Sequence, residues 1–146
     1  MSLVVDPGCG SGRFSLAALS ALPRARGLAL DIDPLAALMT RANAVVLGCA
    51  ERLEVRCEDF RGVSLEGLRG PGRALFVGNP PYVRHHDIER QWKDWFSANC
   101  GELGIKGSRL SGLHAHFLLA TALLAKPGDL GVYITSSEWL NVNYGE

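Results

Sequence analysis

Several features that would tie the chain to one environment are missing from its sequence. Fifteen basic and fifteen acidic side chains cancel, so no net charge draws the whole chain onto nucleic acid. There is no signal peptide and no apolar run of about eighteen residues, which argues against secretion and membrane insertion. The four cysteines lack a Cys-x-x-Cys pair and metal-ligand spacing. We therefore expect reduced thiols in a cytoplasmic protein with no metal site.

The composition is typical of a globular protein, and strand and helix patterns alternate along the sequence. Its 146 residues are 47% hydrophobic, enough for one domain with a sizeable core. The alternation favours an α/β domain whose parallel sheet is covered on both faces. The predicted strands are 3–5, 27–30, 53–57, 75–77 and 131–135, and the predicted helices are 14–22, 34–47 and 113–125.

A glycine-rich turn follows the first predicted strand. Gly8, Gly10 and Gly12 let a ligand approach the backbone, and the next helix points its amino end at that ligand. NAD, FAD and S-adenosylmethionine all suit such a turn. The spacing differs from the Gly-x-Gly-x-x-Gly dinucleotide pattern, and Asp6 before Pro7 would repel phosphates but suit an ammonium or sulfonium. We favour S-adenosylmethionine; a tight turn without a ligand is the alternative.

Acidic residues also follow the second and third predicted strands. Asp31 is placed to accept hydrogens from both hydroxyls of a ribose. Asp33 precedes Pro34 and is better explained as a helix cap. Asp59 can accept from an adenine amino group while Phe60 stacks on the ring; alternatively, they are a turn residue and a core residue. Acidic residues after three successive strands are stronger evidence than any one of them.

The tetrapeptide Asn79-Pro80-Pro81-Tyr82 follows the fourth predicted strand. If the Asn79 side-chain oxygen and the Pro80 carbonyl accept both hydrogens of an aromatic amine, its nitrogen pyramidalises and exposes its lone pair. Attack on a sulfonium methyl then needs mainly orientation and a dry pocket. Tyr82 would stack on the base, which must be flipped out of a duplex. The alternative is a rigid turn with Tyr82 merely packed.

Together these segments resemble the gamma-type N6-adenine DNA methyltransferases of restriction–modification systems. The family's first four motifs correspond, in order, to residues 6–12, 31–34, 59–60 and 79–82. Residues 113–117 and 134–140 look like its later structural motifs. The resemblance implies a Rossmann-like class I methyltransferase core with sheet order 3-2-1-4-5, S-adenosylmethionine as methyl donor and a flipped adenine of DNA as acceptor.

The resemblance also assigns roles to residues. Cofactor contacts fall on Asp6, Pro7, Gly8, Gly10, Gly12, Asp31, Ile32, Asp59 and Phe60, and catalysis on Asn79, Pro80, Pro81 and Tyr82. The family's segment before the first motif, its last strands and its target-recognition domain have no counterpart here. We therefore expect residues 1–146 to be a truncated catalytic core, weak or inactive alone. A restriction or specificity subunit is an expected partner.

Basic and aromatic side chains are interleaved in residues 83–109. They would either contact phosphates beside a flipped base, or form a solvated lid whose tryptophans pack on an absent part. We expect this stretch to be disordered without DNA or a partner. His114 and His116 are interpreted as packing or surface residues, and Trp139 and Tyr144 as packing at the end of the fifth strand.

Two other classes of function stay open. Asn-Pro-Pro-Tyr also serves methyl transfer to RNA amines and to the glutamine amide of release factors, although the basic and aromatic stretch favours a nucleic acid. A non-catalytic methyltransferase-like subunit is the other alternative. The presence of Asp31, Asp59 and Asn79 argues against it, because a scaffold needs none of them.

Overall fold

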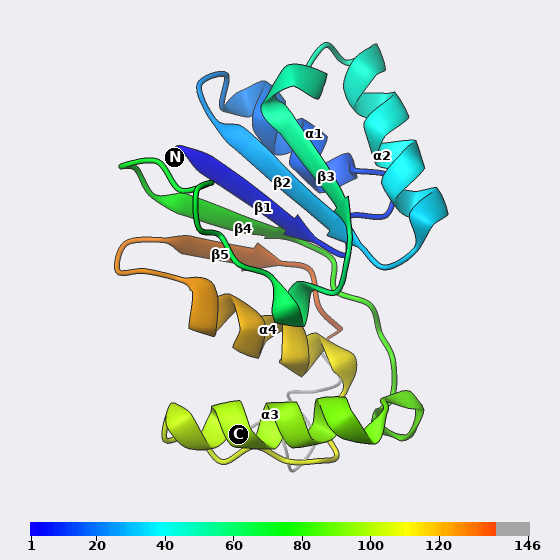
Figure 1. The fold of residues 1–146 in the computed structure, drawn as a ribbon, viewed down its shortest axis with the longest axis vertical. Coiled ribbons are helices and arrows are strands. Elements are labelled where there is room, and N and C mark those ends of the chain that lie inside the picture. The colour runs from blue at the N-terminus through cyan, green and yellow to red at the C-terminus, as the bar shows by residue number, and fades with distance from the viewer. Residues whose placement is uncertain (137–146) are drawn as a thin grey trace.

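The computed structural model describes residues 1–136, which form a five-stranded parallel sheet in the order β3-β2-β1-β4-β5 (Figure 1). The predicted fold class and strand order are confirmed. Trp139, Tyr144 and the end of the 134–140 segment lie outside the described residues. The strands are β1 (Leu3–Pro7), β2 (Arg26–Asp31), β3 (Leu53–Cys57), β4 (Ala74–Gly78) and β5 (Leu130–Tyr133).

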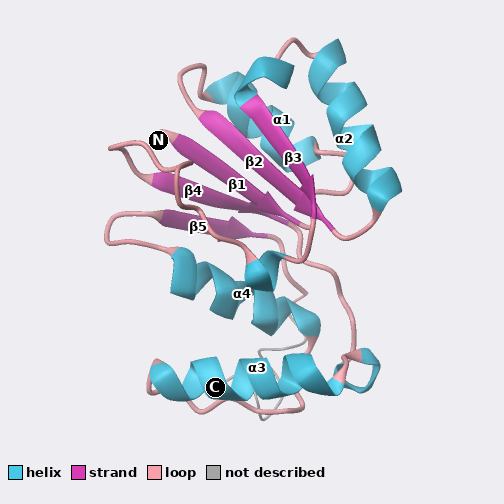
Figure 2. Cartoon of the chain, viewed as in Figure 1, coloured by secondary structure: helices cyan, strands magenta, loops and turns pink. Residues whose placement is uncertain are grey.

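The central strands are buried on both faces, because successive side chains enter two different cores. Leu3 and Val5 of β1 belong to one hydrophobic cluster, whereas Val4 between them belongs to another. Helices cover both faces of the sheet (Figure 2). Four α-helices are described: α1 (Arg13–Ala21), α2 (Pro34–Val46), α3 (Arg90–Glu102) and α4 (Leu113–Leu124).

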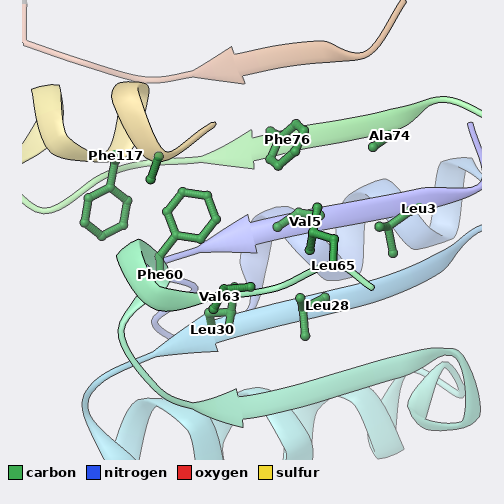
Figure 3. Packing of buried hydrophobic residues seen from close by; sticks show 11 residues of the cluster. Leu3, Val5, Leu28, Leu30, Phe60, Val63, Leu65, Ala74, Phe76 and Phe117 are labelled. Atoms are coloured by element: carbon green, nitrogen blue, oxygen red, sulfur yellow. The ribbon is translucent and has the colours of Figure 1, made fainter. Parts of the chain in front are cut away.

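Each face of the sheet has its own cover. The Val4 face packs against α1 and α2 through residues such as Leu19 and Ala37. The opposite face packs against α4 and the connection after β3, where Phe60 of the short 3-10 helix η2 (Phe60–Gly62) meets Phe117 (Figure 3). The hydrophobic core of this domain is therefore built around β1, β2 and β4.

The stretch 83–109 is ordered, and the prediction of disorder is wrong. After the short 3-10 helix η3 (His85–Asp87) it forms α3, which lies on the side of α4 away from the sheet (Figure 1). Phe96 and Cys100 of α3 pack against Leu119 of α4 in a small third cluster. The tertiary contact explains the order, since an isolated thirteen-residue helix of this polarity is marginal in water.

The strand order places a switch point between β1 and β4, the two strands from which the chain moves toward opposite edges of the sheet. Ligands of open α/β sheets bind at the carboxyl ends of strands beside such a point. The loops that begin at Gly8 and Asn79 leave the sheet there. At the far edge, β5 leaves Leu130 47% and Val132 57% exposed.

Within residues 1–136, no helix combines the length and apolar character needed to cross a lipid bilayer. The same residues contain no group of His, Cys, Asp and Glu side chains arranged to hold a metal ion. All four cysteines carry free thiols, and Cys57 is the exposed one.

Candidate functional site

A cleft of about 210 Å³ opens at the carboxyl edge of the sheet. It is lined from four strand ends, by Gly8 after β1, Asp31 after β2, Asp59 after β3 and Asn79 after β4. The glycine turn and the Asn-Pro-Pro-Tyr segment therefore face one common space, as the sequence predicted. The complete lining is Gly8, Leu30, Asp31, Ile32, Glu58, Asp59, Phe60, Arg61, Asn79, Pro81, Val83, Leu113 and Phe117.

Glycine is required in the turn at two positions for different reasons. Gly8 has φ +70°, and a Cβ there would lie 3.5 Å from both Phe117 and Pro81, so it would fill the cleft between them. Gly12 has φ +81°, and its Cβ would approach Thr40 Cγ2 to 2.9 Å. The first glycine keeps the cleft open, and the second lets α1 and α2 approach each other closely.

Side chains from β2 and α2 hold the turn in place. The Gly10 amide donates to Asp31 Oδ2 at 2.9 Å, and the Gly10 carbonyl accepts from the Thr40 hydroxyl at 3.0 Å. Asn43 donates its side-chain amide to the Ser11 carbonyl at 3.0 Å. The turn is thus preorganised by three separate side chains; the sequence predicted Asp31 as a ribose acceptor, and none of the three as a support of the turn.

Asp6 lies behind the turn rather than among the residues that line the cleft. Its carboxylate is fully buried, and Oδ2 accepts from the Ser15 amide in the first turn of α1 at 2.8 Å. Oδ1 has no hydrogen-bond partner among the described residues. Burial raises the pKa of Asp6 to about 6, and the nearby charge of Asp31 adds slightly to the increase. Pro7, at the end of β1, is also fully buried.

Asp31 combines a structural role with free acceptor capacity. Oδ2 accepts from Gly10 and Oδ1 accepts from the Asp33 amide at 3.0 Å, which leaves one lone-pair position on each oxygen. Ile32 follows with 71% of its surface exposed, an apolar side chain on the wall of the cleft. Asp33 caps α2 by accepting from the Leu35 amide at 2.9 Å, so the predicted cap is confirmed.

Asp59 is bound by the arginine two residues after it. Oδ1 accepts from Arg61 N and Nε, both at 2.9 Å, and Oδ2 accepts from Nη2 at 2.6 Å. Burial alone would raise the pKa of Asp59, but the bonds and charge of Arg61 lower it overall. Phe60 is only 3% exposed and its ring lies 5.6 Å from that of Phe117 (Figure 3). Phe60 is thus a core residue whose rim reaches the cleft.

The Asn-Pro-Pro-Tyr segment presents its two ends to solvent and buries its centre. Asn79 is exposed, Pro80 is fully buried and Pro81 lines the cleft. Tyr82 is 53% exposed, and its hydroxyl lies within hydrogen-bond distance of Asn79 Oδ1. The structure thus links the amide and the aromatic ring that were predicted to act separately on a base.

The aromatic residues of α3 point inward. Trp95 and Phe96 stack on His116 of α4, with ring centroids 6.1 and 4.5 Å away. His116 is 1% exposed, which confirms its interpretation as a packing residue, and burial lowers its pKa to about 4. Trp95 therefore packs on α4 of this chain, whereas one interpretation placed the tryptophans of this stretch against an absent part.

Several basic side chains near α3 are paired. Asp94 accepts from Arg109 Nη1 at 2.7 Å, and Arg90 Nε lies 3.9 Å from the same carboxylate. Both pairs are solvent-exposed and contribute little stability. The interpretation that acidic residues balance the basic charge is supported at these two positions.

Sequence reasoning missed part of the cleft wall. The missed charged residues are Glu58 and Arg61. The sequence did carry a signal for Arg61, because Asp59-Phe60-Arg61 places opposite charges two residues apart in a predicted turn. The apolar lining gave no signal, since its side chains look like ordinary core residues. These missed apolar residues are Leu30, Val83, Leu113 and Phe117.

Two methyltransferase families match different parts of the chain. Residues 74–146 match the Eco57I restriction-modification methylase family, and residues 1–66 match the ribosomal protein L11 methyltransferase (PrmA) family. The chain is 55% identical over 142 residues to the Type II methyltransferase M.XamI of Xanthomonas campestris pv. amaranthicola. That alignment covers 97% of this chain and 27% of M.XamI, so the chain spans about a quarter of that relative's length.

More distant similarities extend beyond restriction–modification proteins. The chain is 36% identical over 136 residues to the MTRF1L release factor glutamine methyltransferase of Homo sapiens, covering 88% of this chain and 38% of that protein. The fold is similar to the crystal structure of TrmN from Thermus thermophilus, with a TM-score of 0.58 and 21% identity. That match covers 91% of this chain and 33% of TrmN.

Proposed function

The chain belongs to the Eco57I restriction-modification methylase family, and we propose that it forms the core of a DNA methyltransferase. The reaction is transfer of a methyl group from S-adenosylmethionine to the N6 amine of an adenine flipped out of the duplex. The observation that carries the proposal is the shared cleft, in which Gly8, Asp31 and Asp59 face Asn79 across one space. Association with a restriction or specificity subunit stays a prediction.

The donor side of the cleft fits a nucleoside. The free acceptor positions of Asp31 suit two ribose hydroxyls, and Ile32 and the rim of Phe60 offer apolar surface to a purine ring. Gly8 leaves room where a side chain would close the cleft. S-adenosylmethionine, when bound, supplies the activated methyl group. Asp6 does not contact the ligand itself. It accepts a hydrogen bond from the Ser15 amide and so fixes the start of α1, whose amino end faces the ligand.

The acceptor side of the cleft fits an aromatic amine. Asn79 is exposed at the mouth, so its side-chain oxygen is accessible to a base that enters from solvent. Accepting the amine hydrogens there and at the Pro80 carbonyl concentrates the lone pair on nitrogen, and Tyr82 gives the ring a stacking surface. The apolar walls at Pro81 and Phe117 exclude water from the reacting centre.

Glutamine methylation is the second candidate, and the 36% identity to the release factor enzyme favours it. A glutamine amide needs the same carbonyl acceptors as an aromatic amine but no stacking surface. The half-exposed Tyr82 ring, which offers a flat surface for stacking, supports a planar base instead.

A competition among substrates tests the proposal. The complete protein that contains this core is incubated with radiolabelled S-adenosylmethionine and, in separate reactions, duplex DNA, RNA or a glutamine-bearing release factor. We expect N6-methyladenine in DNA only, and Asn79→Ala should reduce turnover by about a thousandfold while changing cofactor affinity less than about threefold. Label on RNA or on glutamine alone would assign the enzyme to another class. Loss of cofactor binding in Asn79→Ala would show that the two sides of the cleft are misassigned.

A further inference from the structure

The Arg61 side chain connects the cleft to α3. On one side its guanidinium forms a two-pronged contact with Asp59, through Nε to Oδ1 at 2.9 Å and Nη2 to Oδ2 at 2.6 Å. On the other side its Cζ lies 3.7 Å from the centroid of the Trp92 ring on α3. The Arg61 side chain is only 8% exposed, so both contacts are shielded from water. We call this set the Asp59–Arg61–Trp92 bridge.

The two-pronged contact with Arg61, called the fork below, leaves Asp59 with a defined free acceptor position. Oδ1 is fully used by the Arg61 backbone and Nε, whereas Oδ2 accepts one bond and keeps one lone-pair position. Asp59 lines the cleft and is ionised at neutral pH, because Arg61 outweighs its desolvation and lowers its pKa. A charged acceptor held in one orientation suits a single N–H donor, such as the exocyclic amine of a purine.

Trp92 contacts Arg61 but does not line the cleft. It is not among the described residues that line the cleft, and its ring face packs on the guanidinium. Arg61 Nη1 is buried with no hydrogen-bond partner among those residues. A desolvated guanidinium gains most from an aromatic face, so removal of the ring leaves the arginine free to leave the fork.

We propose that Arg61 is a positioning residue for recognition of the cofactor's purine, and that Trp92 of α3 sets how firmly Arg61 holds Asp59. The inference rests on the proposed function, since it concerns the same cofactor site. It goes beyond that function by making α3, a helix that does not itself line the cleft, a determinant of cofactor specificity. Because coupling between sites is reciprocal, whatever repositions α3 changes cofactor affinity, and cofactor binding steadies α3.

Titration calorimetry with two ligands tests the bridge. One ligand is S-adenosylhomocysteine and the other is its analogue in which hydrogen replaces the purine 6-amino group. The wild-type protein should bind the analogue roughly 10- to 100-fold more weakly, the effect of losing a hydrogen bond to a charged group. Arg61→Met should reduce this ratio to about threefold or less, because Asp59 is no longer oriented.

Variants of α3 separate the bridge from general packing. Trp92→Leu should lower the ratio at least about threefold, whereas Trp92→Phe should preserve it because a phenyl face still covers the guanidinium. Gln91→Ala is the matched control on the same helix, since Gln91 is exposed and, among residues 1–136, its side chain bonds to Glu89 alone. Its ratio should equal that of the wild type.

The outcomes distinguish this inference from the proposed function. If the complete wild-type protein binds neither ligand, both fail. If it discriminates between the ligands and Arg61→Met discriminates equally, the bridge has no role although the cofactor assignment stands. Arg61→Lys is a second variant in case Arg61→Met does not fold. Lysine keeps the positive charge but cannot form the two-pronged contact with Asp59. If folded Arg61→Lys protein shows the same ratio of affinities for the two ligands as the wild type, the inference is also wrong.

Discussion

The hydroxyl of Tyr82 donates to Asn79 Oδ1 at 2.8 Å, and the Ile134 carbonyl oxygen lies 3.1 Å from the same hydroxyl. A single O–H can donate to only one of these acceptors at a time. The Asn79 oxygen therefore gives one of its two lone-pair positions to Tyr82 in this structure, and the other stays available to a target amine. Rotation of the hydroxyl toward Ile134 frees both positions.

This relationship predicts different effects for two substitutions of Tyr82. Tyr82→Phe keeps the stacking ring and frees the Asn79 oxygen, so KM for DNA should stay equal or fall. Tyr82→Ala loses base stacking, which contributes about 1–3 kcal/mol, so KM should rise about tenfold or more. Steady-state kinetics on duplex DNA measure both. Equal damage in the two variants would show that the hydroxyl, not the ring, is what the reaction needs.

Asp31→Asn should weaken cofactor binding before it affects turnover. Asparagine replaces a charged acceptor of ribose hydroxyls and of the Gly10 amide by a neutral one, so Kd should rise about 10- to 100-fold. At saturating cofactor kcat should change less than about fivefold. Asp33→Asn is the control two residues away, because asparagine caps helices as well as aspartate does. Similar losses in both variants would contradict a direct role of Asp31.

His116 should make folding stability depend on pH. Its pKa falls from 6.5 to about 4 on folding, so its contribution is complete above pH 6.5 and is lost as the pH falls toward 4. The total is about 3 kcal/mol. Asp6 acts in the opposite direction between pH 6 and 4, because its pKa is raised on folding. Urea unfolding at pH 7.5 and pH 5 should therefore be compared between the wild type and His116→Phe.

The variant removes only the histidine contribution, so the difference in unfolding free energy between the two proteins should shift with pH in favour of His116→Phe at pH 5. A difference that is constant from pH 7.5 to 5 would mean that His116 does not titrate differently in the folded and unfolded states.

Gly12→Ala should destabilise the fold more than Gly10→Ala does. Both glycines have positive φ, so alanine is strained at either position by roughly 1–2 kcal/mol. Only at Gly12 does the new Cβ meet Thr40 Cγ2 at 2.9 Å, which adds about 1–3 kcal/mol of overpacking. Chemical denaturation in the absence of ligand measures the difference. Equal free energies of unfolding would show that α2 shifts away without cost.

The sequence predicted the sheet and the meeting of its loops because strand ends follow from apolar runs and turn residues. Asp31, Asp59 and Asn79 were expected together since parallel strands end at one edge. Helix α3 was missed because its few apolar positions, such as Phe96, are separated by charged residues, and their partners lie on α4. The Arg61 fork and the Tyr82 hydrogen bond depend on side-chain rotamers, which local sequence does not determine.

The outer strand of the sheet has a practical consequence for biochemical work. Within residues 1–136, β5 is an edge strand on which Leu130 and Val132 are about half exposed, and an exposed apolar edge strand readily pairs with a neighbouring molecule. Concentrated preparations of residues 1–146 alone should accordingly form oligomers that grow with concentration in light scattering. Val132→Lys should place a charge on this edge strand and so prevent the association.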